Sequence, residues 1–266
     1  MTNYYCSQKR CLVYLSQPAT HDYWDTHWES SRSSVQPLPR RSFIVATTKR
    51  FLPLQSRILE GGCGSGLHLR SLTHAGFTVT GVDYAPLTVS YLQDKFPLLT
   101  VLQSDIRDLP FSDCTFNGYW SIGVIEHFWS GYTPILSEAF RVLEPGSFLF
   151  LSFPSLSLLR RLKIFLRLYP QFPSDQAACP PDFYQFVLDP ISVSDHCNRL
   201  GFSLISSIPY DGLKGLKDEI SFLKPLLQPL YDSRILPAKV IQYFLNIVLS
   251  PITNHSTILV LRKTLD

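Results

Sequence analysis

The sequence predicts an α/β protein built on a mostly parallel sheet with helices on both faces. Segments typical of buried strands alternate with helical segments from residue 57 to residue 153, a pattern that favours parallel strands joined by helices. A glycine turn, Glu60-Gly-Gly-Cys-Gly-Ser-Gly66, joins the first strand to its helix. Acidic residues, Glu60 and Asp83, end the first two strands. Because such sheets bind ligands at the carboxyl ends of their strands, these residues predict a site there.

The elements follow one another in a regular order. The first strand, 57–60, enters the glycine turn, and a helix over 67–75 follows directly. Further strands are expected at 77–83, 100–103, 116–122, 147–153, 202–208 and 258–261. Further helices are expected at 86–96, 132–143, 157–169, 192–200 and 240–249. Breakers such as Pro145-Gly146 separate these segments.

We expect two regions in the chain. Residues 1–50 are mixed aromatic and polar, and His21-Asp-Tyr-Trp-Asp-Thr-His-Trp28 is typical of an amphipathic helix. This N-terminal helical arm either packs on the main domain or forms a lid over the ligand. Residues 51–266 are expected to form the α/β domain, with two cap inserts over about 157–190 and 209–250.

Composition excludes several classes of protein. No run of about 18 uncharged apolar residues is present, and residues 1–20 lack the apolar block of a signal peptide, so we expect a cytoplasmic protein. Six scattered cysteines predict reduced thiols, with neither a disulfide framework nor a metal site. The net charge of +3 is small and basic residues are spread along the chain, so no nucleic-acid partner is expected. The composition does not indicate an oligomeric state.

The glycine turn favours a ligand that lacks a pyrophosphate. Gly62-Cys-Gly-Ser-Gly66 has the spacing G-x-G-x-G, whereas a dinucleotide site would have its third glycine at Leu67. Glu60 suits an amine, and the start of the following helix suits a carboxylate. Asp83 follows about 20 residues later, where it could accept both hydroxyl protons of a ribose. Asp105, after the third strand, could accept from an adenine amine.

Five motifs occur in a fixed order between about residues 50 and 155. They are Ile58-Leu-Glu-Gly-Gly-Cys-Gly-Ser-Gly66, Thr80-Gly-Val-Asp83, Ser104-Asp-Ile-Arg-Asp-Leu-Pro-Phe111, Ser121-Ile-Gly-Val-Ile-Glu-His127 and Glu138-Ala-Phe-Arg-Val-Leu-Glu-Pro-Gly146. Together they resemble the class I S-adenosylmethionine-dependent methyltransferases, especially a small-molecule branch similar to the quinone-biosynthesis enzymes. Glu60 and Asn117 depart from the aspartates that are commoner in this family.

The resemblance implies a Rossmann-like, doubly wound, seven-stranded, mostly parallel sheet with an antiparallel last strand, and a methyltransferase domain over residues 51–266. It also implies S-adenosylmethionine as co-substrate. The implied contacts are Glu60, Gly62 and Gly64 with the methionine part, Asp83 with the ribose, Tyr84 on the adenine face, and Asp105 with Ile106 at the adenine edge.

Methyl transfer from a sulfonium is an in-line displacement in which alignment supplies most of the catalysis. A base is needed only when the acceptor must lose a proton. His127, beside Glu126 after the fourth strand, is the candidate catalytic base. Its alternative role is that of a helix-start or core histidine. A single Glu–His pair does not predict a metal site.

The inserts are expected to select the acceptor. They are rich in Leu, Phe, Tyr and Pro, with an aromatic cluster at Phe183-Tyr-Gln-Phe-Val187, which indicates an aromatic or lipid-like small molecule. The basic helix around Arg160 and the apolar helix around Phe244 either make a peripheral membrane contact or pack their apolar faces on the sheet with solvated arginines. We favour the second arrangement.

Two other functions remain open from the sequence. The first is a non-catalytic S-adenosylmethionine-binding regulatory protein that keeps the cofactor pocket. The second is a nicotinamide-dependent oxidoreductase, which the G-x-G-x-G spacing opposes.

Overall fold

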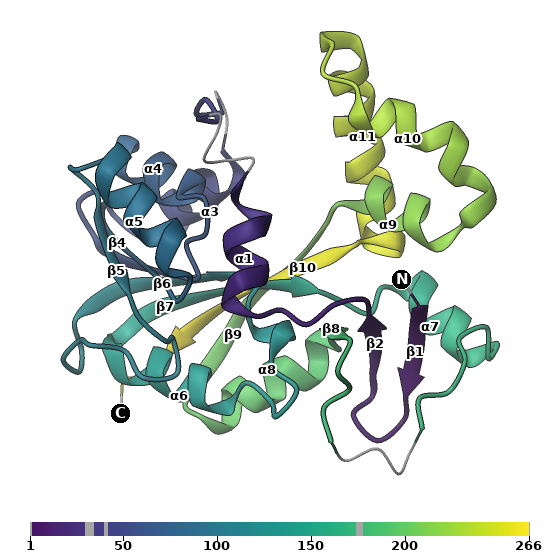
Figure 1. Ribbon diagram of the computed structural model, residues 1–266, viewed down its shortest axis with the longest axis horizontal. Coiled ribbons are helices and arrows are strands. Elements are labelled where there is room, and N and C mark those ends of the chain that lie inside the picture. Colours follow the sequence, from purple (N-terminus) through teal and green to yellow (C-terminus); the bar gives the residue numbers. More distant parts are fainter. Residues whose placement is uncertain (1, 30–34, 40–41, 174–177, 266) are drawn as a thin grey trace.

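The computed structural model describes residues 2–29, 35–39, 42–173 and 178–265. Its core is a seven-stranded sheet in the order β5-β4-β3-β6-β7-β10-β9 (Figure 1). The strands are β3 (Arg57–Gly61), β4 (Thr78–Asp83), β5 (Thr100–Gln103), β6 (Phe116–Ile122), β7 (Leu143–Pro154), β9 (Phe202–Tyr210) and β10 (Ser256–Lys263). Strands β3 to β7 pair in parallel, whereas β10 runs antiparallel to both β7 and β9. The predicted doubly wound fold with an antiparallel last strand is confirmed.

Helices cover both faces of this sheet. The helices concerned are α3 (Phe43–Phe51), α4 (Leu67–His74), α5 (Pro86–Lys95), α6 (Thr133–Val142) and α8 (Pro190–Arg199). Neighbouring strand residues point to opposite faces, so Ile58 packs in the core under α3, α4 and α5 while Leu59 packs in the core under α6 and α8. This explains why the buried strands read as continuous apolar runs.

A second, three-stranded sheet corrects the expectation for the N-terminal region. The helix α1 (His21–His27) forms as predicted, but residues 2–15 are a hairpin of β1 (Thr2–Cys6) and β2 (Cys11–Leu15). Strand β2 pairs with β8 (Phe183–Val187), which was expected only as an aromatic cluster in the first cap insert. The local pattern could not reveal this pairing because the partner strand lies far along the chain.

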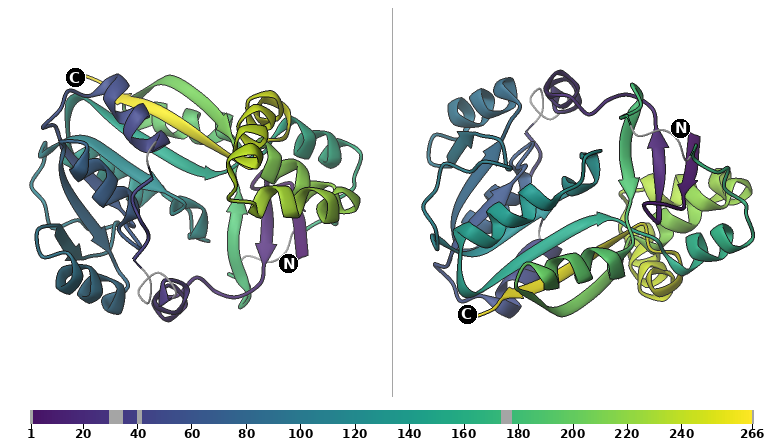
Figure 2. Two further views of the ribbon diagram at one scale, coloured as in Figure 1. Left: turned by 90° about the horizontal axis from the view of Figure 1, so that it is seen from above. Right: turned by 90° about the horizontal axis from the view of Figure 1, so that it is seen from below.

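A helical cap is formed by residues of the two regions expected to hold cap inserts. It comprises α7 (Leu158–Phe165), α9 (Gly212–Glu219), α10 (Lys224–Asp232) and α11 (Leu236–Thr253). The cap and the second sheet lie at the same end of the molecule, away from α4 and α5 (Figure 2). Helix α9 crosses α11 so closely that a Cβ on Gly215 would lie 1.6 Å from the carbonyl oxygen of Thr253. Across the described part of the chain, no helix is both long and apolar enough to cross a membrane.

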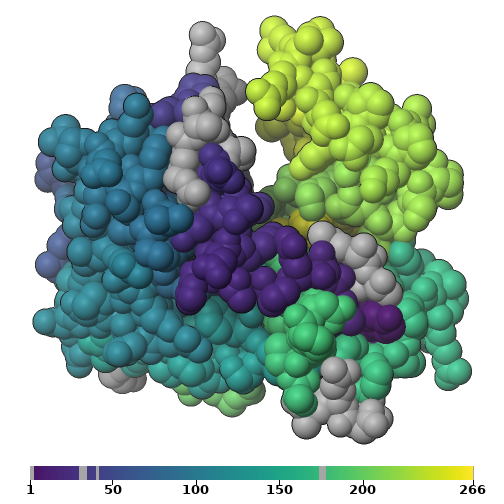
Figure 3. All heavy atoms as spheres, viewed as in Figure 1, coloured from purple at the N-terminus to yellow at the C-terminus, as the bar shows by residue number. Residues whose placement is uncertain are grey.

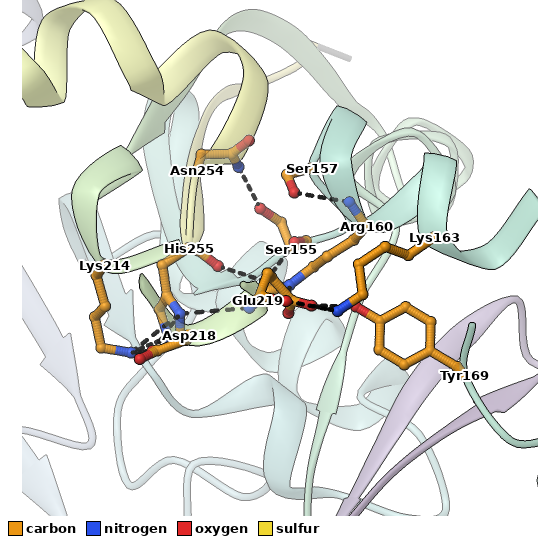
Figure 4. Close-up of polar contacts among 10 residues, drawn as sticks. All are labelled: Ser155, Ser157, Arg160, Lys163, Tyr169, Lys214, Asp218, Glu219, Asn254 and His255. Atoms are coloured by element: carbon orange, nitrogen blue, oxygen red, sulfur yellow. Dashed lines mark hydrogen bonds and ion pairs between the residues drawn. The ribbon is translucent and has the colours of Figure 1, made fainter. Parts of the chain in front are cut away.

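Both expected features of the cap helices need correction. Arg160 was expected to be solvated, but it is fully buried and its Nε donates to Glu219 Oε1 at 2.7 Å (Figure 4). Lys163 and Tyr169 donate to the same carboxylate. The apolar residues of α11, such as Phe244, were expected to pack on the sheet, but they are exposed. A helix's own periodicity identifies an apolar or charged face without identifying the element that covers it.

Candidate functional site

A pocket of about 430 Å³ lies at the carboxyl ends of the strands. Seven of the predicted site residues line this pocket: Gly62, Gly64, Asp83, Tyr84, Asp105, Ile106 and His127. The eighth, Glu60, does not line it, because its side chain is buried at the end of β3. Seven of the eight predicted residues therefore lie around one pocket.

The glycine turn forms the base of the pocket. Gly62, Gly64 and Gly66 all have φ between 47° and 75°, a region that favours glycine. A Cβ on Gly62 would lie 2.6 Å from Val124, and one on Gly64 would lie 2.6 Å from the Trp28 ring. The N-cap residue of helix α4, Gly66, offers no side-chain acceptor. Leu69 donates its backbone N–H to Glu60, which leaves the N–H groups of Leu67 and His68 in the first turn available to an anionic group.

Asp83 connects the tip of β4 to the glycine turn. Its Oδ2 accepts from the backbone N–H of Gly64 at 2.8 Å, and its Oδ1 accepts from that of Ala85 at 3.0 Å. Burial raises the pKa of this carboxyl, and the backbone donors oppose that rise. Each carboxylate oxygen has a further lone pair, so the group can still accept from the hydroxyls of a ribose.

Asp105 and Tyr84 line the pocket with their polar atoms already engaged. Arg107 donates from Nη2 and Nε to the Asp105 carboxylate at 2.6 and 3.0 Å, and this pairing lowers the pKa of Asp105. An adenine amine would therefore share the carboxylate with a guanidinium. The Tyr84 hydroxyl donates to the carbonyl of Ala19 at 2.9 Å, and its ring meets His21 edge-on.

Helix α1 covers the pocket; the sequence left its role open between a packing arm and a lid over the ligand, and predicted none of its residues as site residues. Trp24 and Trp28 are among the lining residues. Asp25 fixes the helix in place, because its Oδ1 accepts from the backbone N–H and the hydroxyl of Thr88, both at 2.9 Å. It thereby caps α5, whose own N-cap residue, Ala85, offers no side-chain acceptor. The aromatic residues at 21–28 were the available signal for this role.

His127 lies in the pocket wall with a defined tautomer. Its Nδ1 lies 2.7 Å from the carbonyl oxygen of Tyr184 in β8. A carbonyl only accepts, so Nδ1 carries the hydrogen and Nε2 is left as an acceptor. Burial lowers the pKa of His127 to about 4, so the ring is neutral near pH 7. The second sheet thus orients a residue of the segment that follows β6.

Two buried carboxyl groups, Glu60 and Glu126, each have an Oε2 with no hydrogen-bond partner within the described residues. Burial, with a contribution from the Asp83 carboxylate, raises the pKa of Glu60 to about 8. Burial raises the pKa of Glu126 to about 8 as well. Both are therefore mainly protonated at neutral pH. Over the described chain, no group of three His, Cys, Asp or Glu side chains is arranged to hold a metal ion.

The residues present fit S-adenosylmethionine. Any Cβ would obstruct the turn at Gly62 and Gly64, so the backbone there can lie directly against a ligand. Asp83 matches a ribose, and the orphaned oxygen of Glu60 would gain a partner from an ammonium group. The first turn of α4 suits the carboxylate of the same ligand.

Comparison with known proteins agrees with this fit. A family described as "Methyltransferase domain" matches residues 59–151. A probable S-adenosylmethionine-dependent methyltransferase of Mycolicibacterium smegmatis is 32% identical over 98 residues, which cover 37% of this chain and 38% of that protein. The match therefore spans well under half of the curated relative.

Two solved structures show the same fold at low sequence identity. The [4+2]-cyclase SpnF has a TM-score of 0.59 and 14% identity, with 96% of this chain and 99% of that chain covered. A 1,6-didemethyltoxoflavin-N1-methyltransferase of Burkholderia thailandensis, solved with S-adenosylhomocysteine, has a TM-score of 0.54 and 13% identity, with 99% and 100% covered.

Proposed function

Because the chain carries a class I S-adenosylmethionine-dependent methyltransferase domain, we propose that the protein transfers a methyl group from this co-substrate to a small-molecule acceptor. The observation that carries the proposal is the hydrogen bond between Gly64 N–H and the Asp83 carboxylate. This bond places two features in one pocket: the glycine turn, which can accommodate the methionine part of the co-substrate, and the Asp83 carboxylate, which suits its ribose.

The chain's residues would hold the co-substrate as follows. The first turn of α4 takes the carboxylate, and Glu60, ionised by the approach of the ammonium group, balances its charge. Asp83 accepts from the ribose hydroxyls. Tyr84 and Ile106 supply apolar contact to the adenine, and the Asp105 and Arg107 pair lies at its edge.

The co-substrate supplies an electrophilic methyl group on a positively charged sulfur. The acceptor's lone pair forms the new bond to the methyl carbon, while the carbon–sulfur bond breaks and its electron pair stays on sulfur. The protein's main task is to align these groups and exclude water, and the indoles of Trp24 and Trp28 over the pocket support that role. His127 Nε2 receives the acceptor's proton where one must leave, and then passes it to solvent.

Thermal shift with S-adenosylhomocysteine and NADH tests the cofactor. We expect stabilisation by the first compound, and stabilisation by NADH alone would exclude the proposal. A transfer assay with methyl-labelled S-adenosylmethionine against lipid and aqueous extracts then tests the reaction. Binding without transfer would favour the regulatory alternative. The transfer assay is needed because the fold alone does not establish methyl transfer: a protein named as a cyclase shares it.

A further inference from the structure

A second cavity, of about 580 Å³, adjoins the first. It lies between α3 and α11, with the start of α4 and the end of β9 at its base, and we call it the α3–α11 cleft. Ile122, at the end of β6, lines both cavities. A molecule in the cleft would therefore lie next to a ligand on the glycine turn.

One face of α11 forms a wall of the cleft. Its lining residues are Tyr243, Asn246, Ile247, Ser250 and Pro251, whose spacing places them on a single side of the helix. Two of them are widely exposed, with Tyr243 at 64% and Ile247 at 55%. Across the cleft, Phe43 of α3 is 48% exposed. Apolar side chains thus face the cleft from both sides without being covered.

The cap is fixed in place, so this apolar face is held away from the sheet. Gly212 and Gly215 allow α9 to pack directly against the backbone of α11. Arg160 joins α9 to the sheet region, because it binds Glu219 and also donates to the carbonyls of Ser155 and His255 (Figure 4). Figure 3 shows the molecule hollowed between the cap and the N-terminal part of the chain.

The polar groups of the cleft indicate the charge of its ligand. Among the described lining residues there is no Lys or Arg, and Asp211 carries the one carboxylate. Asn246 and Ser250 already accept from backbone N–H groups of α9. His68, in the first turn of α4, has no hydrogen-bond partner within the part of the chain that the structure describes. Arg40 and Arg41, between the lining residues Pro39 and Ser42, lie outside the described residues. Among the lining residues that the structure describes, a phosphate or carboxylate would find no cation, whereas an uncharged apolar molecule with one polar group would find both kinds of contact.

We propose that the α3–α11 cleft binds the methyl acceptor, and that this acceptor is an uncharged, lipid-like molecule. Its apolar part lies along Tyr243 and Ile247 of α11, and its polar end passes Ile122, which lines both cavities, toward His127 in the first pocket. This assignment rests on the proposed methyl transfer and adds the class of acceptor to it.

Binding of the neutral fluorescent probe Nile red tests the assignment. Ile247→Asp and Phe43→Asp place a charge on opposite walls of the cleft, and each is expected to weaken probe binding about tenfold or more. Val248→Asp is the matched control, because Val248 is 69% exposed on α11 but does not line the cleft. The control should change binding less than about twofold, as is usual for an exposed site. Dodecanol should displace the probe, and dodecyl phosphate should not.

Several results would overturn the assignment. These are equal loss of probe binding in Ile247→Asp and Val248→Asp, no loss in either wall variant, or displacement by dodecyl phosphate as effective as by dodecanol. Loss of binding to phosphatidylcholine vesicles in both α11 variants, with unchanged Nile red binding, would instead make α11 a membrane contact. Calorimetry with S-adenosylhomocysteine on every variant keeps the two proposals separate. If the cofactor proposal is wrong, S-adenosylhomocysteine will bind neither the wild type nor the variants, whatever the result with Nile red.

Discussion

The Asp83 carboxylate and the backbone N–H of Gly64 form a 2.8 Å hydrogen bond that joins two adjacent strand ends into one binding surface. The bond fixes the glycine turn relative to the tip of β4. The same carboxylate is also the proposed acceptor for the ribose hydroxyls, so one side chain both shapes the site and contacts the ligand.

Asp83→Ala should weaken binding of S-adenosylhomocysteine by about 1 to 3 kcal/mol, because it removes a hydrogen-bonding carboxylate and leaves the Gly64 donor unpaired. Calorimetry measures this change. Asp94→Ala, at an exposed position on α5, is the control and should leave affinity unchanged. Equal affinities for wild type and Asp83→Ala would contradict the ribose assignment.

Asp25→Ala should speed the release of S-adenosylhomocysteine. Its loss removes the contacts that hold α1 on Thr88, and loss of such a cap costs about 1 kcal/mol, or roughly a fivefold faster release. Stopped-flow displacement, followed by tryptophan fluorescence, measures the rate. Asp25→Asn keeps an acceptor oxygen, so its release rate should lie between those of the wild type and Asp25→Ala. An unchanged release rate would show that α1 does not retain the ligand.

His127→Gln should slow turnover while leaving the affinity for S-adenosylhomocysteine close to that of the wild type. The variant removes Nε2, the free acceptor nitrogen. The glutamine amide can still donate to the Tyr184 carbonyl, which accepts from His127 Nδ1 in the wild type. His196→Gln is the control, because His196 contacts Thr133 and does not line the pocket. If both variants turn over at the wild-type rate, His127 is not the base.

The pH dependence of stability tests the burial of His127. Its pKa falls from 6.5 to about 4 on folding, so His127 is protonated at a higher pH in the unfolded chain than in the folded protein. The stability contributed by the neutral ring is present above about pH 6.5 and is lost as pH falls toward 4. Between about pH 7.5 and 5, wild type should lose about 2 kcal/mol more than His127→Gln in urea unfolding. Parallel losses would contradict the lowered pKa.

Cofactor binding should release a proton from Glu60. Its pKa is raised to about 8 by burial and the Asp83 carboxylate, and a bound ammonium group would lower it again. Affinity for S-adenosylhomocysteine should therefore rise with pH up to about 8. Calorimetry in phosphate and in Tris detects the proton. Glu60→Gln should abolish the difference between buffers, whereas Glu126→Gln, at the other buried carboxyl, should keep it. Equal wild-type heats in both buffers would exclude this coupling.

Arg160→Met should destabilise the fold by about 3 kcal/mol, at the lower end of the range for a broken buried pair. The lower value is expected because Lys163 still donates to Glu219. Urea unfolding measures the change. Arg57→Met breaks an exposed pair with Glu144 and should cost less than about 1 kcal/mol. Equal costs would show that the buried pair does not stabilise the cap.

The sequence by itself determined the sheet and most of the candidate site. Alternation of strands and helices predicted that β3 to β7 run parallel, and the carboxyl ends of parallel strands meet at one edge of the sheet. Gly62, Gly64, Asp83 and His127 therefore line one pocket, as the spacing predicted. The glycines also indicated a sharp turn, and the structure has Gly62, Gly64 and Gly66 at positive φ angles, which glycine adopts without strain.

Only the tertiary structure decided the partners of the buried polar groups and strands. It paired β2 with β8, Arg160 with Glu219, and Asp25 with the start of α5. The periodicity of a helix or strand indicates which of its faces is buried. It does not identify the charged residue that pairs with a buried side chain, or the strand that pairs with a free edge, because these partners come from segments distant in the chain. For the same reason, the apolar face of α11 reads as a packing surface in the sequence, and only the position of the cap leaves it facing an open cleft.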